Sequence, residues 1–210
     1  MQKLVIEGEN TLKGEVTVSG SKNAALPILA ATLLTDEPCV LHNVPRLRDT
    51  RTMVALLESL GKTVEWKADQ VTVKSAGTAD YVADYKLVST MRGSFCVLGP
   101  LLAKLHKAKV SLPGGCIIGV RPVDLHLKGL KMLGAHIDIE NGYVNAQTRR
   151  LNGAHVYLGG MFGSSVLATA NILMAATLAK GETIIESAAC EPEIENLTQF
   201  LIAMGARIKG

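Results

Sequence analysis

Aromatic residues are scarce in this sequence, at 4% of 210 residues with one Trp and three Phe. Proteins that bind single-stranded nucleic acid stack bases on aromatic side chains, so the scarcity argues against that function. A charge excess is also lacking, because 22 Lys and Arg face 19 Asp and Glu for a formal net charge of +3. This balance predicts no nucleic-acid or membrane partner from electrostatics alone. Any affinity for anions must therefore be local.

Metal-ligand and disulfide patterns are lacking too. The four cysteines are far apart, without a CxxC pair or a histidine cluster at zinc-ligand spacing, so we expect no metal, no cofactor and no disulfide scaffold. The charged N-terminus has no apolar core of a secretory signal, which predicts a cytoplasmic protein with reduced thiols. The longest apolar stretch, 166–179, contains Thr169, Asn171 and Thr177 and is shorter than the roughly 20 residues that span a bilayer.

An internal repeat of about 70 residues runs through the chain, whose 48% hydrophobic content is enough to form a core. Three segments, MVALLESLGKTVEW, HLKGLKMLGAHIDI and LTQFLIAMGARIKG, each show helical spacing of apolar residues, then a glycine, then a strand pattern. The glycines are Gly61, Gly134 and Gly205, and each is expected to end its helix in the left-handed conformation. The chain is therefore predicted to contain three similar units.

A second set of helices lies half a period away, and its members are apolar nearly all round, which predicts that they are buried. They are expected at 24–34, 92–105 and 165–179, with strands at 15–18, 39–42, 71–74, 109–112 and 183–186. The predicted fold is α/β: one pseudo-threefold, inside-out α/β barrel domain of three strand-helix-strand-helix-strand-strand repeats around buried helices. The third unit ends at Gly210 without closing strands like 70–74 or 143–147, so we expect a truncated chain.

The starts of the buried helices are candidate anion sites. Small hydroxyl residues and glycines precede each one, as in GSKN, STMRGS and GSS, and ordinary N-capping explains any one of them. If the repeat holds, the three N-termini point the same way and their free N–H groups converge on one end of the domain. Lys22 and Arg92 lie in two of the first turns, so this end is predicted to bind an anion.

A glycine-rich loop, LPGGCIIGVRPVDLH, has no counterpart of similar length in the other two units. Long loops of this kind are often functional lids. Cys116, beside glycines and Arg121, is a candidate acid or nucleophile, whereas Cys39, Cys96 and Cys190 are interpreted as inert small apolar residues. His126 is expected to cap or pack, and Asp124 is either a helix-start carboxylate or a ligand contact.

The strings GEVTVSGSKNAALPILAATLL, STMRGS and LPGGCIIGVRPVDLH resemble the UDP-N-acetylglucosamine 1-carboxyvinyltransferase family, the enolpyruvyl transferases that begin bacterial peptidoglycan synthesis. The resemblance covers the whole chain, and family members are about twice as long. It implies that this chain is the N-terminal half, that residues 21–210 form the transferase domain, and that residues 1–20 pack against a missing C-terminal domain. That domain is therefore one expected partner.

The resemblance also implies roles for individual residues. Lys22 and Arg121 would bind phosphoenolpyruvate, Cys116 would act as general acid, form a covalent adduct or aid product release, and the inhibitor fosfomycin would alkylate this cysteine. The sugar nucleotide would contact Asn23, Arg92, the stretch Arg121, Pro122, Val123, Asp124 and Leu125, and, less closely matched, Ser165 and Val166.

The implied reaction adds the sugar 3-hydroxyl to C2 of phosphoenolpyruvate while C3 is protonated, and then expels phosphate to leave an enol ether. Fixed positive charge, converging dipoles and exclusion of water would stabilise its anionic intermediate. Because the family's base carboxylate lies in the C-terminal half, we expect no meaningful turnover from this chain alone. Three alternatives remain: 3-phosphoshikimate 1-carboxyvinyltransferase, a sugar-nucleotide binding module without turnover, and a structural repeat protein.

Overall fold

A computed structural model describes residues 3–114, 123–161 and 163–210 of the protein. The first repeat begins with the helix α1 and forms a three-stranded antiparallel sheet with the order β1-β3-β2. Its elements are α1 (Lys22–Ala31), the 3₁₀ helix η1 (Thr32–Leu34), β1 (Cys39–Leu41), α2 (Arg48–Ser59), β2 (Lys62–Lys67) and β3 (Gln70–Ser75). Gly61 ends α2 with a φ of 93°, and Gly134 and Gly205 repeat this geometry at 95° and 101°, as the sequence predicted.

The second repeat is the complete one. Its sheet has the order β4-β5-β7-β6, with β4 parallel to β5 and the remaining pairs antiparallel. Its elements are β4 (Val82–Ala83), α3 (Tyr85–Val88), the 3₁₀ helix η2 (Arg92–Val97), α4 (Leu98–Leu105), β5 (Lys107–Ser111), α5 (Asp124–Met132), β6 (His136–Glu140) and β7 (Tyr143–Gln147). The predicted unit of strand, helix, strand, helix and hairpin is thus present here in full.

The third repeat contains β8 (His155–Tyr157), α6 (Val166–Ala176), β9 (Ile184–Glu186) and α7 (Pro192–Ala203). Strands β8 and β9 pair in parallel, like β4 and β5. In the described part of the chain no hairpin closes this sheet, and the three sheets remain separate rather than joining into a closed barrel. The α/β class and the three repeats are confirmed, whereas closure into a barrel is not observed.

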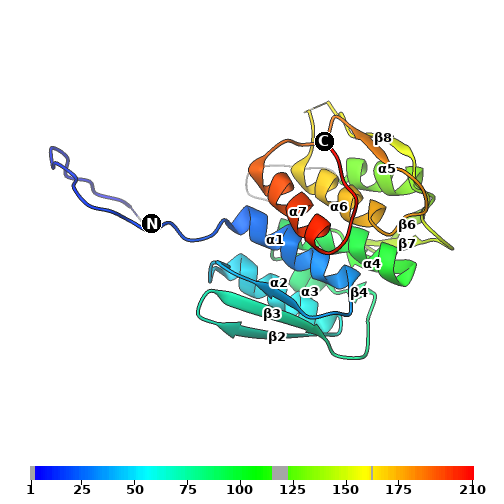
Figure 1. The fold of residues 1–210 in the computed structure, drawn as a ribbon, viewed down its shortest axis with the longest axis horizontal. Helices are drawn as coiled ribbons and strands as arrows, with labels where there is room; N and C mark the ends of the chain where they lie inside the picture. The colour runs from blue at the N-terminus through cyan, green and yellow to red at the C-terminus, as the bar shows by residue number, and fades with distance from the viewer. Residues whose placement is uncertain (1–2, 115–122, 162) are drawn as a thin grey trace.

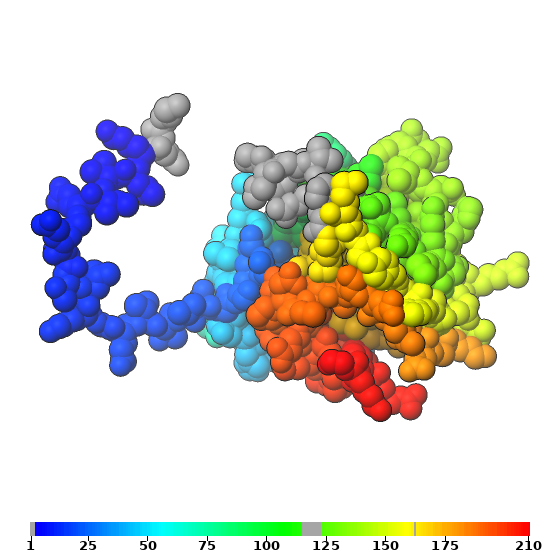
Figure 2. Space-filling view, turned by 90° about the horizontal axis from the view of Figure 1, so that it is seen from above, coloured from blue at the N-terminus to red at the C-terminus, as the bar shows by residue number. Residues whose placement is uncertain are grey.

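The strand predicted at 15–18 is wrong. Residues 3–20 form neither helix nor strand, and they extend away from the body as the blue chain in Figures 1 and 2. A strand needs a ladder partner, and alternating residues alone do not provide one. The segment exposes apolar side chains that are each at least 77% accessible: Leu4, Val5, Ile6, Leu12, Val16 and Val18.

Three helical segments, α1, η2 with α4, and α6, form the centre of the domain. In α6 every residue from Ala168 to Ala175 is buried, and in α4 every residue from Leu98 to Ala103. The less hydrophobic helices lie against them: α2 and α7 contact α1, which lies between them in Figure 1, and α5 contacts α6. The prediction that the apolar helices are buried is therefore confirmed.

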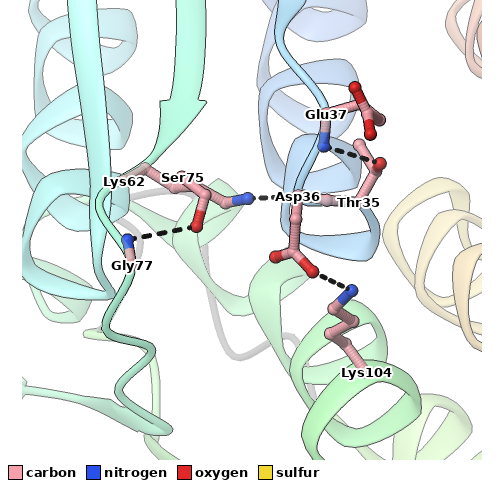
Figure 3. A network of polar contacts seen from close by, with 7 residues as sticks. All are labelled: Thr35, Asp36, Glu37, Lys62, Ser75, Gly77 and Lys104. Carbon is pink, nitrogen blue, oxygen red and sulfur yellow. Dashed lines mark hydrogen bonds and ion pairs between the residues drawn. The ribbon is translucent and has the colours of Figure 1, made fainter.

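Polar contacts join the turn that follows α1 and η1 to the last turn of α4 and to β2 (Figure 3). The Lys104 ammonium lies 2.7 Å from an Asp36 carboxylate oxygen, and Lys62 Nζ donates a 2.6 Å hydrogen bond to the Thr35 carbonyl oxygen. Burial lowers the pKa of Lys62, although Asp36 opposes that shift. At the other end, a Cβ at Gly93 would lie 2.9 Å from Leu26 Cδ1. Helix α1 thus packs against η2, while η1 and Asp36, which follow α1, contact α4, so α1 and the η2–α4 segment run parallel.

Gly99 permits the closest approach between α4 and α6. A methyl group at this position would lie 2.3 Å from the Asn171 carbonyl oxygen, which is part of the helix backbone and cannot move aside. We expect Gly99→Ala to lower the free energy of unfolding by about 2 kcal/mol or more, although alanine favours a helix by up to about 1 kcal/mol. Urea denaturation measures this loss.

Gly129→Ala on α5 is the matched control. Its methyl group would meet the Cδ1 and Cγ1 atoms of Ile172 at 2.6 Å, and a side chain can rotate where a backbone carbonyl cannot. The loss of stability should therefore be smaller than for Gly99→Ala. Equal stability of the two variants would show that the α4–α6 contact can relax.

Candidate active site

The first turn of α1 places Lys22 and Asn23 at the surface. Ser21 is the N-cap, since its hydroxyl accepts a 3.4 Å hydrogen bond from the Ala24 N–H, as the sequence predicted. Lys22 Nζ lies 2.9 Å from an oxygen of Asp49, the second residue of α2, and both side chains are partly exposed. The Lys22 ammonium is thus fixed beside the start of α1 by a carboxylate that an incoming anion could displace.

Arg92 begins η2 and is half-buried. The predicted hydroxyl cap is wrong at this helix, because the N-cap is Met91, which makes no capping bond. Ser94 instead donates its hydroxyl proton to the carbonyl oxygens of Val88 and Met91. These hydrogen bonds stabilise the turn between Val88 and Met91, and Arg92 directly follows that turn.

Helix α5 begins at Asp124, which is exposed, and Val123 is the preceding cap residue without a side-chain hydrogen bond. Leu125 is half-buried, and its Cδ1 would lie 3.2 Å from a Cβ placed at Gly160. The start of α5 therefore lies against the loop that leads into α6. The position of Asp124 in the first turn fits both predicted roles, a helix-start carboxylate and a ligand contact.

Helix α6 begins at Val166, with Ser165 as its N-cap. The Ser165 hydroxyl accepts a 3.3 Å hydrogen bond from the Ala168 N–H, which confirms the predicted cap. Both residues are half-buried. Leu125 contacts the loop before α6, and Leu26 of α1 lies against Gly93 of η2. Helix α6 also contacts η2, and His126 of α5 packs against Phe95 of η2, so the starts of α1, η2, α5 and α6 lie together at one end of the domain. The structure therefore brings the described candidate residues to that end.

His126 is 2% exposed and packs edge-on against Phe95, with the ring centroids 5.1 Å apart. Burial, together with the positive charge of nearby Arg92, lowers the pKa of His126 to about 3. The imidazole is therefore neutral at physiological pH and packs in the core, as expected. Its electrostatic link to Arg92 shows that the start of α5 lies close to the start of η2.

Cys116, Arg121 and Pro122 lie outside the described residues, as does most of the glycine-rich loop. The loop leaves the body at Gly114, where a Cβ would lie 2.1 Å from the Ser89 carbonyl oxygen. Ser89 immediately follows α3, three residues before Arg92. The described base of the loop is therefore next to the segment that carries Arg92.

The remaining cysteines differ in accessibility. Cys39 and Cys96 are buried as predicted, and burial raises the pKa of both thiols, that of Cys96 to about 12. Cys190 is exposed, so its interpretation as a small apolar residue like the other two is wrong, whereas its inertness stays a prediction. It lies in the loop just before α7, and its side chain faces outward while that of neighbouring Ala189 is buried.

A groove of about 730 Å³ lies elsewhere, along the C-terminal half of α6, and is lined by residues that include Leu173, Ala176, Thr183 and Ile208. None of the candidate residues lines it, so we do not assign it to the active site. No helix in the described ranges is long and apolar enough to cross a membrane.

The profile of the family described as EPSP synthase (3-phosphoshikimate 1-carboxyvinyltransferase) matches residues 6–210 of this chain. The chain belongs to the EPSP synthase family. Within this family it is 54% identical over 210 residues to the UDP-N-acetylglucosamine 1-carboxyvinyltransferase of Methylacidiphilum infernorum, and 55% identical to that of Lawsonia intracellularis. Both alignments cover 100% of this chain and 50% of the relative, so the chain spans about half the length of these relatives.

Two solved structures, at identities that show the fold alone, share this architecture. The enolpyruvyl transferase NikO from Streptomyces tendae superposes with a TM-score of 0.81 at 19% identity, covering 96% of this chain and 47% of that one. EPSP synthase from Acinetobacter baumannii gives 0.71 at 20% identity, covering 94% and 45%. The predicted likeness of the fold to enolpyruvyl transferases is thus confirmed.

Proposed function

We propose that this chain is the N-terminal half of an enzyme that transfers the enolpyruvyl group of phosphoenolpyruvate to the 3-hydroxyl of UDP-N-acetylglucosamine and releases phosphate. The observation that carries the proposal is the 54% identity, across all 210 residues, to a relative named for this reaction. Such an enzyme would supply cell-wall synthesis in the cytoplasm. The clustering of the described candidate residues at one end of the domain supports the same reaction.

In this proposal the two substrates meet at the linked helix starts. Lys22 would exchange its ion pair with Asp49, 2.9 Å away, for the phosphate of phosphoenolpyruvate. Arg92 would supply a second fixed positive charge, and the free N–H groups of the first turns of α1 and α6 would add their dipoles. These groups stabilise the anionic tetrahedral intermediate that forms when the sugar oxygen bonds to C2 and a proton is added to C3.

The sugar nucleotide would lie along the starts of α1, α5 and α6. Asn23, Val123, Asp124, Leu125, Ser165 and Val166 are the described residues assigned to it, and all are exposed or half-buried. Cys116 and Arg121 keep their proposed roles as acid or nucleophile and as phosphoenolpyruvate ligand. Loss of phosphate from C2, with loss of a proton from C3, then leaves the enol ether.

A C-terminal half is the proposed partner of this chain. The relatives are about twice as long, and the exposed apolar residues of the 3–20 segment offer a surface that another domain would cover. The domain division at residue 20 also remains a proposal, supported by the absence of helix and strand in 3–20 and by the start of α1 at Lys22.

The alternative acceptor is shikimate 3-phosphate, and the family profile alone would allow it. The higher identity to UDP-N-acetylglucosamine enzymes, against about 20% to the EPSP synthase structure, favours the sugar nucleotide. The other alternative, a sugar-nucleotide binding module without turnover, would apply to the 210-residue chain alone and not to a protein of the relatives' full length.

An assay of phosphate release distinguishes the proposed transferase from the enzyme that uses shikimate 3-phosphate and from a binding module without turnover. We expect a protein extended to the length of the relatives to release phosphate from phosphoenolpyruvate with UDP-N-acetylglucosamine, but not with shikimate 3-phosphate. The 210-residue chain should bind the sugar nucleotide by calorimetry without releasing phosphate. Release with shikimate 3-phosphate alone would overturn the assigned acceptor, and steady-state turnover by the 210-residue chain would overturn the need for a second half.

A further inference from the structure

One buried amide joins three elements beneath the candidate site. Asn171 is fully buried on α6, and its side chain makes three hydrogen bonds to groups outside that helix. Its Oδ1 accepts from the Gly99 N–H at 2.7 Å, and its Nδ2 donates to the Phe95 carbonyl oxygen at 3.0 Å. The same Nδ2 lies 2.8 Å from His126 Nδ1 on α5. Every side-chain donor and acceptor group of Asn171 is thus used.

These partners fix the protonation of His126. The Gly99 N–H can only donate and the Phe95 carbonyl can only accept, so the amide of Asn171 has one possible orientation. Its second N–H must then donate to His126 Nδ1, which requires an unprotonated nitrogen there and places the ring proton on Nε2. The orientation and the tautomer therefore follow from two backbone groups.

The network lies directly below the helix starts. His126 is two residues after Asp124, Phe95 is three residues after Arg92, and Asn171 is six residues after Ser165. At 1.5 Å per helical residue, Asn171 is about 9 Å along α6 from its N-cap, Ser165. Each partner is therefore within about two turns of a residue proposed to bind the sugar nucleotide.

We propose that Asn171 is a positioning residue, which sets the relative placement of η2, α5 and α6 and thereby of Arg92, Asp124, Leu125, Ser165 and Val166 around the sugar nucleotide. This inference rests on the proposed function. Because Asn171 and His126 are buried, they would act on the substrate only through these helix starts.

Two features make the arrangement intolerant of change. A Cβ at Gly99 would lie 2.8 Å from Asn171 Oδ1, so the amide fills the space between α4 and α6. The Asn171 amide also gives neutral His126 the donor that its Nδ1 requires, and a neutral ring beside Arg92 avoids repulsion between two cations. Loss of the amide would leave the Phe95 carbonyl and His126 Nδ1 without their donor.

Two variants test the role in a protein extended to the length of the relatives. Asn171→Asp keeps the volume and the acceptor for Gly99 but removes both N–H donors, and His126→Phe keeps the ring contact but removes the acceptor at Nδ1. We expect each to raise the KM for UDP-N-acetylglucosamine at least tenfold, while kcat at saturation changes by less than threefold, because bound substrate restores the alignment of the helix starts.

Thr169→Val is the matched control on the same helix. Thr169 is 2% exposed, and its hydroxyl accepts a 3.0 Å hydrogen bond from the Ala189 N–H, so this variant also loses one buried hydrogen bond. It leaves η2 and α5 untouched, and its KM should stay within twofold of wild type even where its melting temperature falls as far as that of the test variants. A KM that follows melting temperature across all three variants would overturn the positioning role.

Nitrogen NMR of histidine-labelled wild-type protein gives a readout that needs no substrate, with the His126 signals identified by their loss in His126→Phe. An unprotonated Nδ1 and a protonated Nε2 are expected, and the reverse tautomer would overturn the inference. Wild-type protein that shows this tautomer but does not bind UDP-N-acetylglucosamine would overturn the proposed function and, with it, the role of Asn171. Wild-type binding with unaffected variants would overturn only the role of Asn171.

Discussion

Fosfomycin is expected to add one molecule to this chain, at Cys116, and none at the other three cysteines. Thiolate attack would open the epoxide ring of the inhibitor, so the label reports which thiol is both accessible and activated. Cys39 and Cys96 are buried and their thiol pKa values are raised, which suppresses the thiolate. Intact mass and peptide mapping, with and without UDP-N-acetylglucosamine, measure the site and rate of addition, and we expect the sugar nucleotide to accelerate it.

Cys190 gives this experiment an internal comparison, because it is exposed on the same chain. Cys116→Ser should abolish labelling, whereas Cys190→Ser should leave its rate unchanged. Equal labelling of Cys116 and Cys190 would mean that the reagent merely detects exposure, and would favour the reading of the glycine-rich loop as a connector. An unlabelled but folded chain that becomes labelled when a C-terminal half is added would show that this half completes the site.

Acid is expected to destabilise the domain through His126. Burial lowers its folded-state pKa to about 3, while the unfolded chain has the ordinary value of about 6.5. Between these values the unfolded state binds more protons, so the free energy of unfolding falls as pH decreases from 6.5 towards 3. The slope approaches about 1.4 kcal/mol per pH unit, and the total reaches about 4 to 5 kcal/mol near pH 3.

Denaturant unfolding from pH 7 to pH 4 in wild type and in His126→Phe measures this contribution. The variant starts less stable, because Asn171 loses a hydrogen-bond acceptor, but its unfolding free energy should vary less with pH. The difference in unfolding free energy between wild type and His126→Phe should therefore shrink steadily as pH falls. Parallel pH profiles would show that His126 is not the group that titrates.

Short sequence patterns predicted those parts of the fold that depend on residues close together in the sequence. Helix-ending glycines at 61, 134 and 205 take positive φ, and Ser21 and Ser165 cap the helices that they precede. The all-round apolar helices are buried because no other environment suits them. The same motifs that indicated the family resemblance also place Lys22, Arg92 and Asp124 in first turns, since helix starts are encoded within a few residues.

Contacts between distant segments were not predictable in this way. The segment 15–18 alternates like a strand but has no ladder partner, Ser94 bonds inward instead of capping, and Cys190 faces outward beside buried Ala189. Asn171 appeared in the sequence only as a polar interruption of an apolar stretch. Its pairing with Phe95 and His126, 76 and 45 residues away, arises when η2, α5 and α6 pack together. The repeat, the helix starts and the residue types available to a substrate depend on local spacing, so they can be read from the chain alone. Which helix starts are neighbours, and what holds them in register, depends on packing in three dimensions, because a buried polar group must find its partners across the core.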